Sequence, residues 1–68
     1  MINLKVGMYV TDLGDAYRSV YQIIRVGLAS ENWTLCRRIG DLQYGNRLVT
    51  GSDRGETYRK TPNLREWK

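Results

Sequence analysis

Histidine and phenylalanine are absent from this sequence of 68 residues, which contains a single cysteine and a single proline. One cysteine excludes an internal disulfide framework. The lack of histidine removes the usual base of nucleophilic catalysis and the commonest ligand of catalytic zinc. We therefore expect no cofactor, no metal site and no enzymatic activity. Without disulfides or metals, a core this small often needs self-association, and a homo-oligomer is one expectation.

Long apolar runs are also missing, since none approaches the roughly 20 residues of a membrane-spanning helix. The segment 1–7, MINLKVG, lacks the apolar centre and cleavage site of a signal peptide. The lone thiol of Cys36 suits a reducing compartment. These features predict a cytoplasmic protein with no membrane partner.

Positive charge is concentrated in one half of the chain. Residues 1–34 contain three basic and three acidic residues, whereas residues 35–68 contain eight basic and four acidic ones, which accounts for the whole net charge of +4. Arginine outnumbers lysine, and its planar guanidinium suits phosphate, carboxylate and stacked contacts. The second half is therefore where we expect binding to an anionic partner.

Seven glycines divide the chain into segments of strand length. The segments VYQIIRV at 20–26 and WTLCRRI at 33–39 are rich in β-branched and aromatic residues, as strands are. Shorter strands are predicted over 8–11, 47–50 and 57–60. Five short antiparallel strands predict an all-β fold for a single domain over 1–68, either a small five-stranded barrel or a strongly twisted sheet.

Three segments of the first half, VGMYVTD at 6–12, YQIIRV at 21–26 and WTLC at 33–36, carry a resemblance. Their order resembles the opening of the small Src-homology-like (SH3-like) β-barrels, a group that includes KOW and Tudor modules. In such barrels a glycine precedes a short strand, a long first loop follows, and a Tyr-x-Ile strand leads into the next hairpin. The resemblance covers about residues 5–40 and implies a fold, with no binding residues carried over.

The C-terminal segment differs from the rest. Thr61 is a suitable helix cap, and Pro62 stands where proline is tolerated, at the first helical position. We expect a short helical turn over 62–67 that places Leu64 and Trp67 on one face and closes an end of the barrel.

Large aromatic side chains must fill the core, because phenylalanine is missing. We assign Tyr9, Tyr21, Trp33 and Trp67 to the core, and Cys36 with them as a buried side chain. The remaining tyrosines, 17, 44 and 58, are expected on the surface.

The candidate binding surface combines arginines and tyrosines of the second half. Aromatic rings beside cations suit unpaired bases, because rings stack on bases while cations hold phosphates. Strand alternation puts Arg37 and Arg38 on opposite faces, and likewise Arg59 and Lys60, so only about half of these charges share a surface. The predicted binding residues are Arg37, Arg38, Tyr44, Arg47, Arg54, Tyr58 and Arg59.

The sequence leaves two partners open for this surface. The first reading is a non-enzymatic domain that binds nucleic acid, DNA or RNA, with modest sequence preference. The alternative is a protein-interaction module, such as a compact inhibitor or adapter of phage or plasmid type, that docks on an acidic protein surface, since arginine and tyrosine are common in interface hot spots. Contacts between copies are expected to use Tyr17, Leu28 and Leu42.

Overall fold

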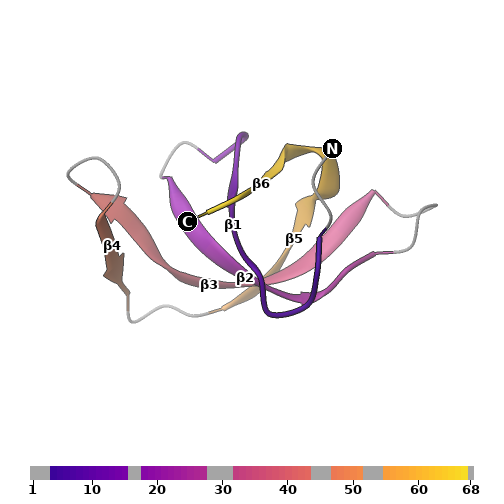
Figure 1. Ribbon diagram of the computed structural model, residues 1–68, viewed down its shortest axis with the longest axis horizontal. Coiled ribbons are helices and arrows are strands. Elements are labelled where there is room, and N and C mark those ends of the chain that lie inside the picture. Colours follow the sequence, from indigo (N-terminus) through magenta and orange to yellow (C-terminus); the bar gives the residue numbers. More distant parts are fainter. Residues whose placement is uncertain (1–3, 16–17, 28–31, 44–46, 52–54, 68) are drawn as a thin grey trace.

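The computed structural model describes residues 4–15, 18–27, 32–43, 47–51 and 55–67. It is an all-β structure with one short 3₁₀ turn (Figure 1). The elements, in chain order, are β1 (Tyr9–Asp12), β2 (Ser19–Arg25), β3 (Trp33–Gln43), β4 (Arg47–Thr50), β5 (Glu56–Lys60), the turn η1 (Thr61–Asn63) and β6 (Leu64–Glu66).

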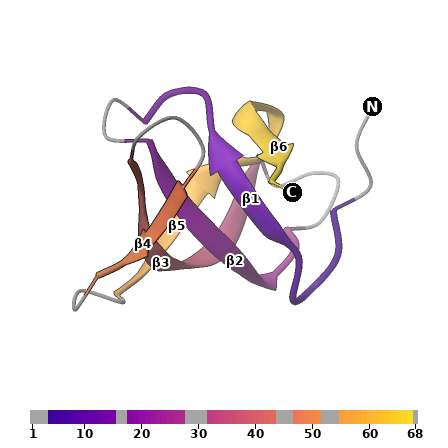
Figure 2. The ribbon, with the colours of Figure 1, turned by 60° about the vertical axis from the view of Figure 1, so that its left-hand side comes forward.

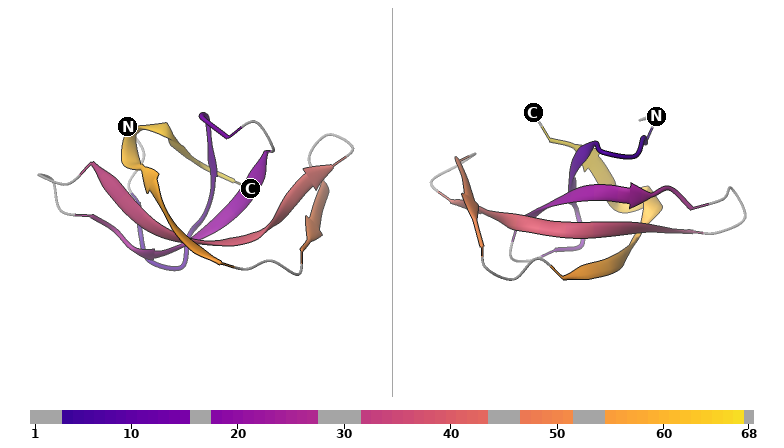
Figure 3. Two further views of the ribbon diagram at one scale, coloured as in Figure 1. Left: turned by 180° about the vertical axis from the view of Figure 1, so that it is seen from behind. Right: turned by 90° about the horizontal axis from the view of Figure 1, so that it is seen from below.

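The long strand β3 organises the sheet. β2 pairs with it antiparallel along one edge, while β5 and β4 pair with successive halves of the other edge. The pairing with β2 shifts register where Val20 lies opposite Gly40 and Tyr21 opposite Arg38, which leaves Ile39 unopposed. Such a bulge bends a strand and increases its twist. Figure 1 and the left-hand view of Figure 3 show β3 curving through the middle of the molecule.

β1 and β6 lie on the concave side of this curved sheet (Figures 1 and 2). β1 pairs antiparallel with β2 on one side and with β6 on the other, so the strand order is β4-β3-β2-β1-β6, with β5 attached to β3. The predicted all-β class is confirmed, and the sheet is twisted and not closed. It has six described strands where the sequence predicts five, because β6 is formed from the C-terminal segment.

The core lies between the concave side of the sheet and the strands β1 and β6. It consists of Val10, Tyr21, Ile23, Cys36 and Leu64, all nearly inaccessible to solvent. Three partly buried residues, Leu4, Met8 and Val26, pack against it. The prediction that Cys36 is a buried core residue is confirmed.

Two of the four aromatic residues assigned to the core are not there. Tyr9 is 42% exposed and Trp33 is 47% exposed, so their assignment to the core is wrong. Strand alternation explains Trp33, because its neighbour Thr34 is the one that faces inward. Only Tyr21 is fully buried, whereas Trp67 is half-buried and meets Tyr9 edge-on with ring centroids 6.5 Å apart.

The helical turn predicted over 62–67 is shorter than expected. The turn η1 spans Thr61–Asn63 and contains Pro62, and the chain then becomes extended as β6. Leu64 therefore enters the core as a strand residue. The prediction that Leu64 and Trp67 share one face of a helical turn is wrong. The physical reason is the free edge of β1, which offers β6 backbone partners that an exposed helical turn would lack.

Candidate ligand-binding surface

The antiparallel pair of strands β3 and β5 presents aromatic side chains on its outward face. Residues opposite each other on antiparallel strands share a face, and Leu35 lies opposite Tyr58. Trp33 is 47% exposed and Tyr58 is 54% exposed. We call this surface the aromatic face; it consists of the pairs Trp33–Lys60, Leu35–Tyr58 and Arg37–Glu56.

Cations accompany these rings. The Lys60 ammonium lies 6.0 Å from the centroid of the Trp33 ring and makes no ion pair within the described part of the chain. Arg37 pairs with Glu56 at 3.3 Å, and both side chains are exposed, so the pair contributes little to stability. On β2, the exposed Arg25 lies opposite Leu35 and adds a third cation beside the face. The surface thus combines two exposed rings with three cations and one carboxylate.

The inward face of the same strand pair holds Arg59 in a different environment. Its Nε donates to Asp12 Oδ2 at 2.5 Å, and the Asp12 side chain is only 3% exposed. Its guanidinium also lies over the Tyr21 ring, 5.2 Å from the centroid. Burial acts to lower the pKa of Arg59, but the bond to Asp12 and the nearby negative charges outweigh it and raise that pKa. Arg59 is therefore held as part of the fold.

Arg38 belongs to the other half of β3. Its side chain forms an ion pair with Asp41, and its Nε donates to Ser19 Oγ at 3.3 Å. Ser19 in turn donates to Asp41 Oδ1 at 2.9 Å. These bonds tie β2 to β3 close to the bulge at Ile39, so Arg38 is engaged within the sheet.

Arg47 is exposed at the start of β4, opposite Gln43. Gln43 is eight residues along β3 from Leu35, which corresponds to roughly 25 Å along the strand. Of the predicted binding residues, the structure brings together Arg37 and Tyr58 on the aromatic face, and it places Arg38 and Arg47 on the other half of β3. Arg59 is on the inward face and shares only the hollow described below with Tyr58. Tyr44 and Arg54 lie outside the described residues.

Sequence reasoning missed three residues of this surface: Trp33, Lys60 and Arg25. The size of Trp33 suggests a core residue. However, neighbouring residues of a strand point to opposite faces, and Thr34 and Cys36 are buried, so Trp33 lies on the outward face. Lys60 and Arg25 could only be found from the strand register, which brings them opposite Trp33 and Leu35.

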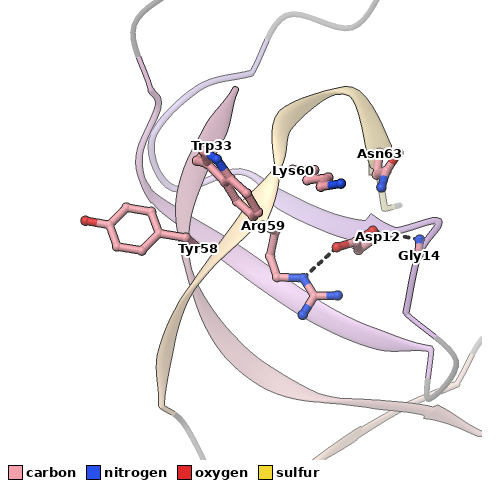
Figure 4. A pocket seen from close by; sticks show the side chains of 7 residues that line it. All are labelled: Asp12, Gly14, Trp33, Tyr58, Arg59, Lys60 and Asn63. Atoms are coloured by element: carbon pink, nitrogen blue, oxygen red, sulfur yellow. Dashed lines mark hydrogen bonds and ion pairs between the residues drawn. The ribbon is translucent and has the colours of Figure 1, made fainter. Parts of the chain in front are cut away.

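A hollow of about 330 Å³ lies beside the aromatic face, between the end of β1, the turn η1 and the paired strands β3 and β5 (Figure 4). One of its walls is Asp12, whose Oδ1 accepts a hydrogen bond from the Gly14 amide at 2.7 Å. The residues that line the hollow are Asp12, Gly14, Trp33, Tyr58, Arg59, Lys60 and Asn63.

Reactive groups are poorly placed for chemistry in the parts of the chain described. Burial raises the pKa of the Cys36 thiol to about 11, so it is not a thiolate near neutral pH. Both oxygens of Asp12 accept hydrogen bonds, one from Gly14 and one from Arg59. No cluster of acidic, cysteine or histidine side chains suited to a metal ion occurs among the described residues.

Comparison of the chain with protein-family models, with curated proteins and with solved structures gave no match. No helix within the described ranges is long and apolar enough to span a membrane. The aromatic face and the hollow are therefore the features from which a function can be inferred.

Proposed function

We propose that this chain is a small non-enzymatic binding domain that binds nucleic acid through the aromatic face. The observation that carries the proposal is the exposure of Trp33 and Tyr58 on neighbouring strands of one face, with cations beside them. Exposed rings of this size cost solvation free energy, and a base stacked on each would cover them. A non-enzymatic role is supported by the lack of histidine and by the raised pKa of the Cys36 thiol.

The proposed mode of binding combines stacking with charge neutralisation. Bases stack on Trp33 and Tyr58, while Arg25, Arg37 and Lys60 contact phosphates. Three phosphate contacts to a single strand give a log–log salt slope of roughly −2. Because every base has an aromatic face, such binding has modest sequence preference.

We further infer that the fold is of the small SH3-like kind that the sequence resembles. Gly7, at a positive φ of 90°, precedes the short strand β1, and the segment 13–18 connects β1 to β2. β2 carries Tyr21 and Ile23 inward and leads directly into the hairpin with β3. The cytoplasmic location predicted from the sequence is kept in this proposal, because a single buried thiol suits a reducing compartment.

The test is fluorescence anisotropy of labelled single-stranded and duplex oligonucleotides, titrated with the protein at about 50 and 200 mM salt. We expect binding that weakens with salt. Tyr58→Ala should reduce affinity roughly 5- to 150-fold, the range for one stacked base. Tyr58→Phe keeps the ring and should bind like the unchanged chain.

Val49→Ala is the matched control for Tyr58→Ala. Val49 is an exposed apolar residue on β4, and β4 pairs with the half of β3 that lies away from the aromatic face. Absence of any anisotropy change at low salt would reject nucleic-acid binding. The aromatic face would then be assigned to the alternative partner, an acidic protein surface, with capture of one specific protein as the next measurement.

A further inference from the structure

The hollow beside the aromatic face presents two polar groups that the fold does not use. Neither the Lys60 ammonium nor the Asn63 side-chain amide makes a hydrogen bond or ion pair with any residue that the structure describes. Figure 4 shows Lys60 between the Trp33 ring and Asn63, all three bordering the same space. The hollow therefore brings together an aromatic surface, a cation and an amide.

The charge balance of the hollow favours an anionic ligand. Three charged side chains line it: Asp12, Arg59 and Lys60. Asp12 is neutralised by its bond to Arg59 at 2.5 Å and by the Gly14 amide. Lys60 is left as the uncompensated charge of the lining, next to a ring on which a flat group can stack.

One side of the hollow is closely packed around a glycine. A Cβ added to Gly14 would lie 3.3 Å from Asn63 Nδ2 and 3.4 Å from Asp12 Oδ1, so it would crowd the wall opposite Trp33. The Leu13 amide donates to the Asn63 carbonyl at 2.9 Å, which fixes the end of β1 against η1. Gly14 and Asn63, which line the same side of the hollow, are thus held together by a backbone contact.

We propose that this hollow binds one nucleotide of a single-stranded nucleic acid, with the base against Trp33, the phosphate at Lys60 and the edge of the base at Asn63. The inference rests on the proposed function and adds the form of nucleic acid. A volume of about 330 Å³ is at the lower end of ligand pockets and suits one nucleotide unit. A base inside a duplex has its faces covered and its edge paired, so it cannot enter without being unstacked.

The first experiment compares single strands with duplexes of the same sequence by anisotropy. We expect the single strand to bind at least about tenfold more tightly, because it alone can place a base in the hollow. Gly14→Ala should weaken single-strand binding roughly tenfold, comparable to loss of one stacked base. Asn63→Ala should weaken it by about fivefold, the usual effect of one lost hydrogen bond.

Neither variant changes the charge of the protein, so the salt slope should stay as in the unchanged chain while the affinity falls. Gln43→Ala is the matched control for Asn63, because it removes an exposed side-chain amide from the other half of β3. Should Gly14→Ala fail to fold, Asn63→Ala with this control still tests the proposal.

A second readout observes the stacking directly. The chain contains two tryptophans, so Trp67→Phe leaves Trp33 as the sole indole. Stacking of a base on Trp33 should quench its fluorescence when a single strand is added, and the quenching should be weaker in the Trp67→Phe, Gly14→Ala double variant.

Different results would reject nucleic-acid binding and the nucleotide-binding hollow. If the unchanged chain binds no oligonucleotide, the proposed function fails and the inference fails with it. If it binds single strands and duplexes equally, or if Gly14→Ala and Asn63→Ala both bind like the unchanged chain, the aromatic face remains the binding site and the nucleotide-binding hollow is overturned.

Discussion

The two faces of the paired strands β3 and β5 differ although they are built from alternating residues of the same two strands. The inward face holds Thr34 and Cys36, both fully buried, with Arg59 fixed to Asp12. The outward face exposes Trp33 and Tyr58. The larger aromatic rings are thus outside and the smaller side chains inside, the reverse of what size alone predicts.

This difference shows how neighbouring cations take different roles. Arg59 and Lys60 are adjacent in the chain, yet Arg59 is a quarter exposed and bonded to a buried carboxylate, while Lys60 is exposed beside an indole ring. Arginine is suited to the inward position because its guanidinium forms a directed bond to Asp12 while it lies flat over Tyr21. Lysine, as a point charge on a flexible stem, is suited to the outward one.

The largest expected effect comes from breaking the inward ion pair. Asp12→Ala removes the partner of Arg59 and also the acceptor for the Gly14 amide. Leaving a buried charge unpaired costs about 3–5 kcal/mol, and the partial exposure of Arg59 reduces this to about 2–3 kcal/mol. Urea unfolding followed by circular dichroism measures the loss. Stability equal to that of the unchanged chain would show that the inward pair is no more important than a surface pair.

The next effect is a loss of stability in alkaline solution. Burial raises the pKa of the Cys36 thiol from 9.0 to about 11 in the folded chain. Between these values the unfolded chain releases a proton that the folded chain keeps, so the free energy of unfolding falls as pH rises, by on the order of 2 kcal/mol. Burial and the bond to Asp15 also raise the pKa of Tyr21, which adds to the fall above pH 10.

The control for this pH dependence is Cys36→Ala, which removes the thiol while leaving Tyr21. Its stability should be lower at neutral pH because of the cavity, but it should change less between pH 9 and 11. The measurement is urea unfolding across this pH range. An equally steep fall in the variant would mean that Cys36 does not cause it.

The sequence predicts strands well where β-branched residues are dense. The segments around β2 and β4 were placed to within a residue, and the turn signal of Pro62 indicated η1 correctly. The end of the chain was misread because β6 exists only through its pairing with β1, a contact between residues more than 50 positions apart. Local propensity contains no information about such a partner.

The candidate site was predicted in part for a similar reason. Alternation correctly separates Arg37 from Arg38, and Tyr58 is exposed as expected. Asp12 binds Arg59 from 47 positions away in the chain, so this arginine is engaged within the fold. Composition alone does not show such a contact. Charge counts overestimate a binding patch wherever acidic residues from elsewhere in the chain reach it.

Charge reversal at two positions tests whether the two halves of β3 differ in nucleic-acid binding. Lys60→Glu, on the aromatic face, should reduce nucleic-acid affinity by roughly tenfold or more at low salt, since it replaces a phosphate contact with a repulsion. Arg47→Glu makes the same change of charge at the other half of the strand and should have a smaller effect. Equal losses in anisotropy titrations would mean that the binding surface extends along the whole of β3.

The smallest effect concerns the outward ion pair. Glu56→Gln removes the only carboxylate of the aromatic face and releases Arg37 from its 3.3 Å contact. An exposed pair contributes about 0–1 kcal/mol, so stability should hardly change, in contrast to Asp12→Ala. Nucleic-acid affinity should rise a few-fold, because one repulsive charge is lost and Arg37 becomes available to phosphate. A fall in affinity would show that Glu56 positions Arg37 for binding, and a large loss of stability would remove the distinction between the two faces.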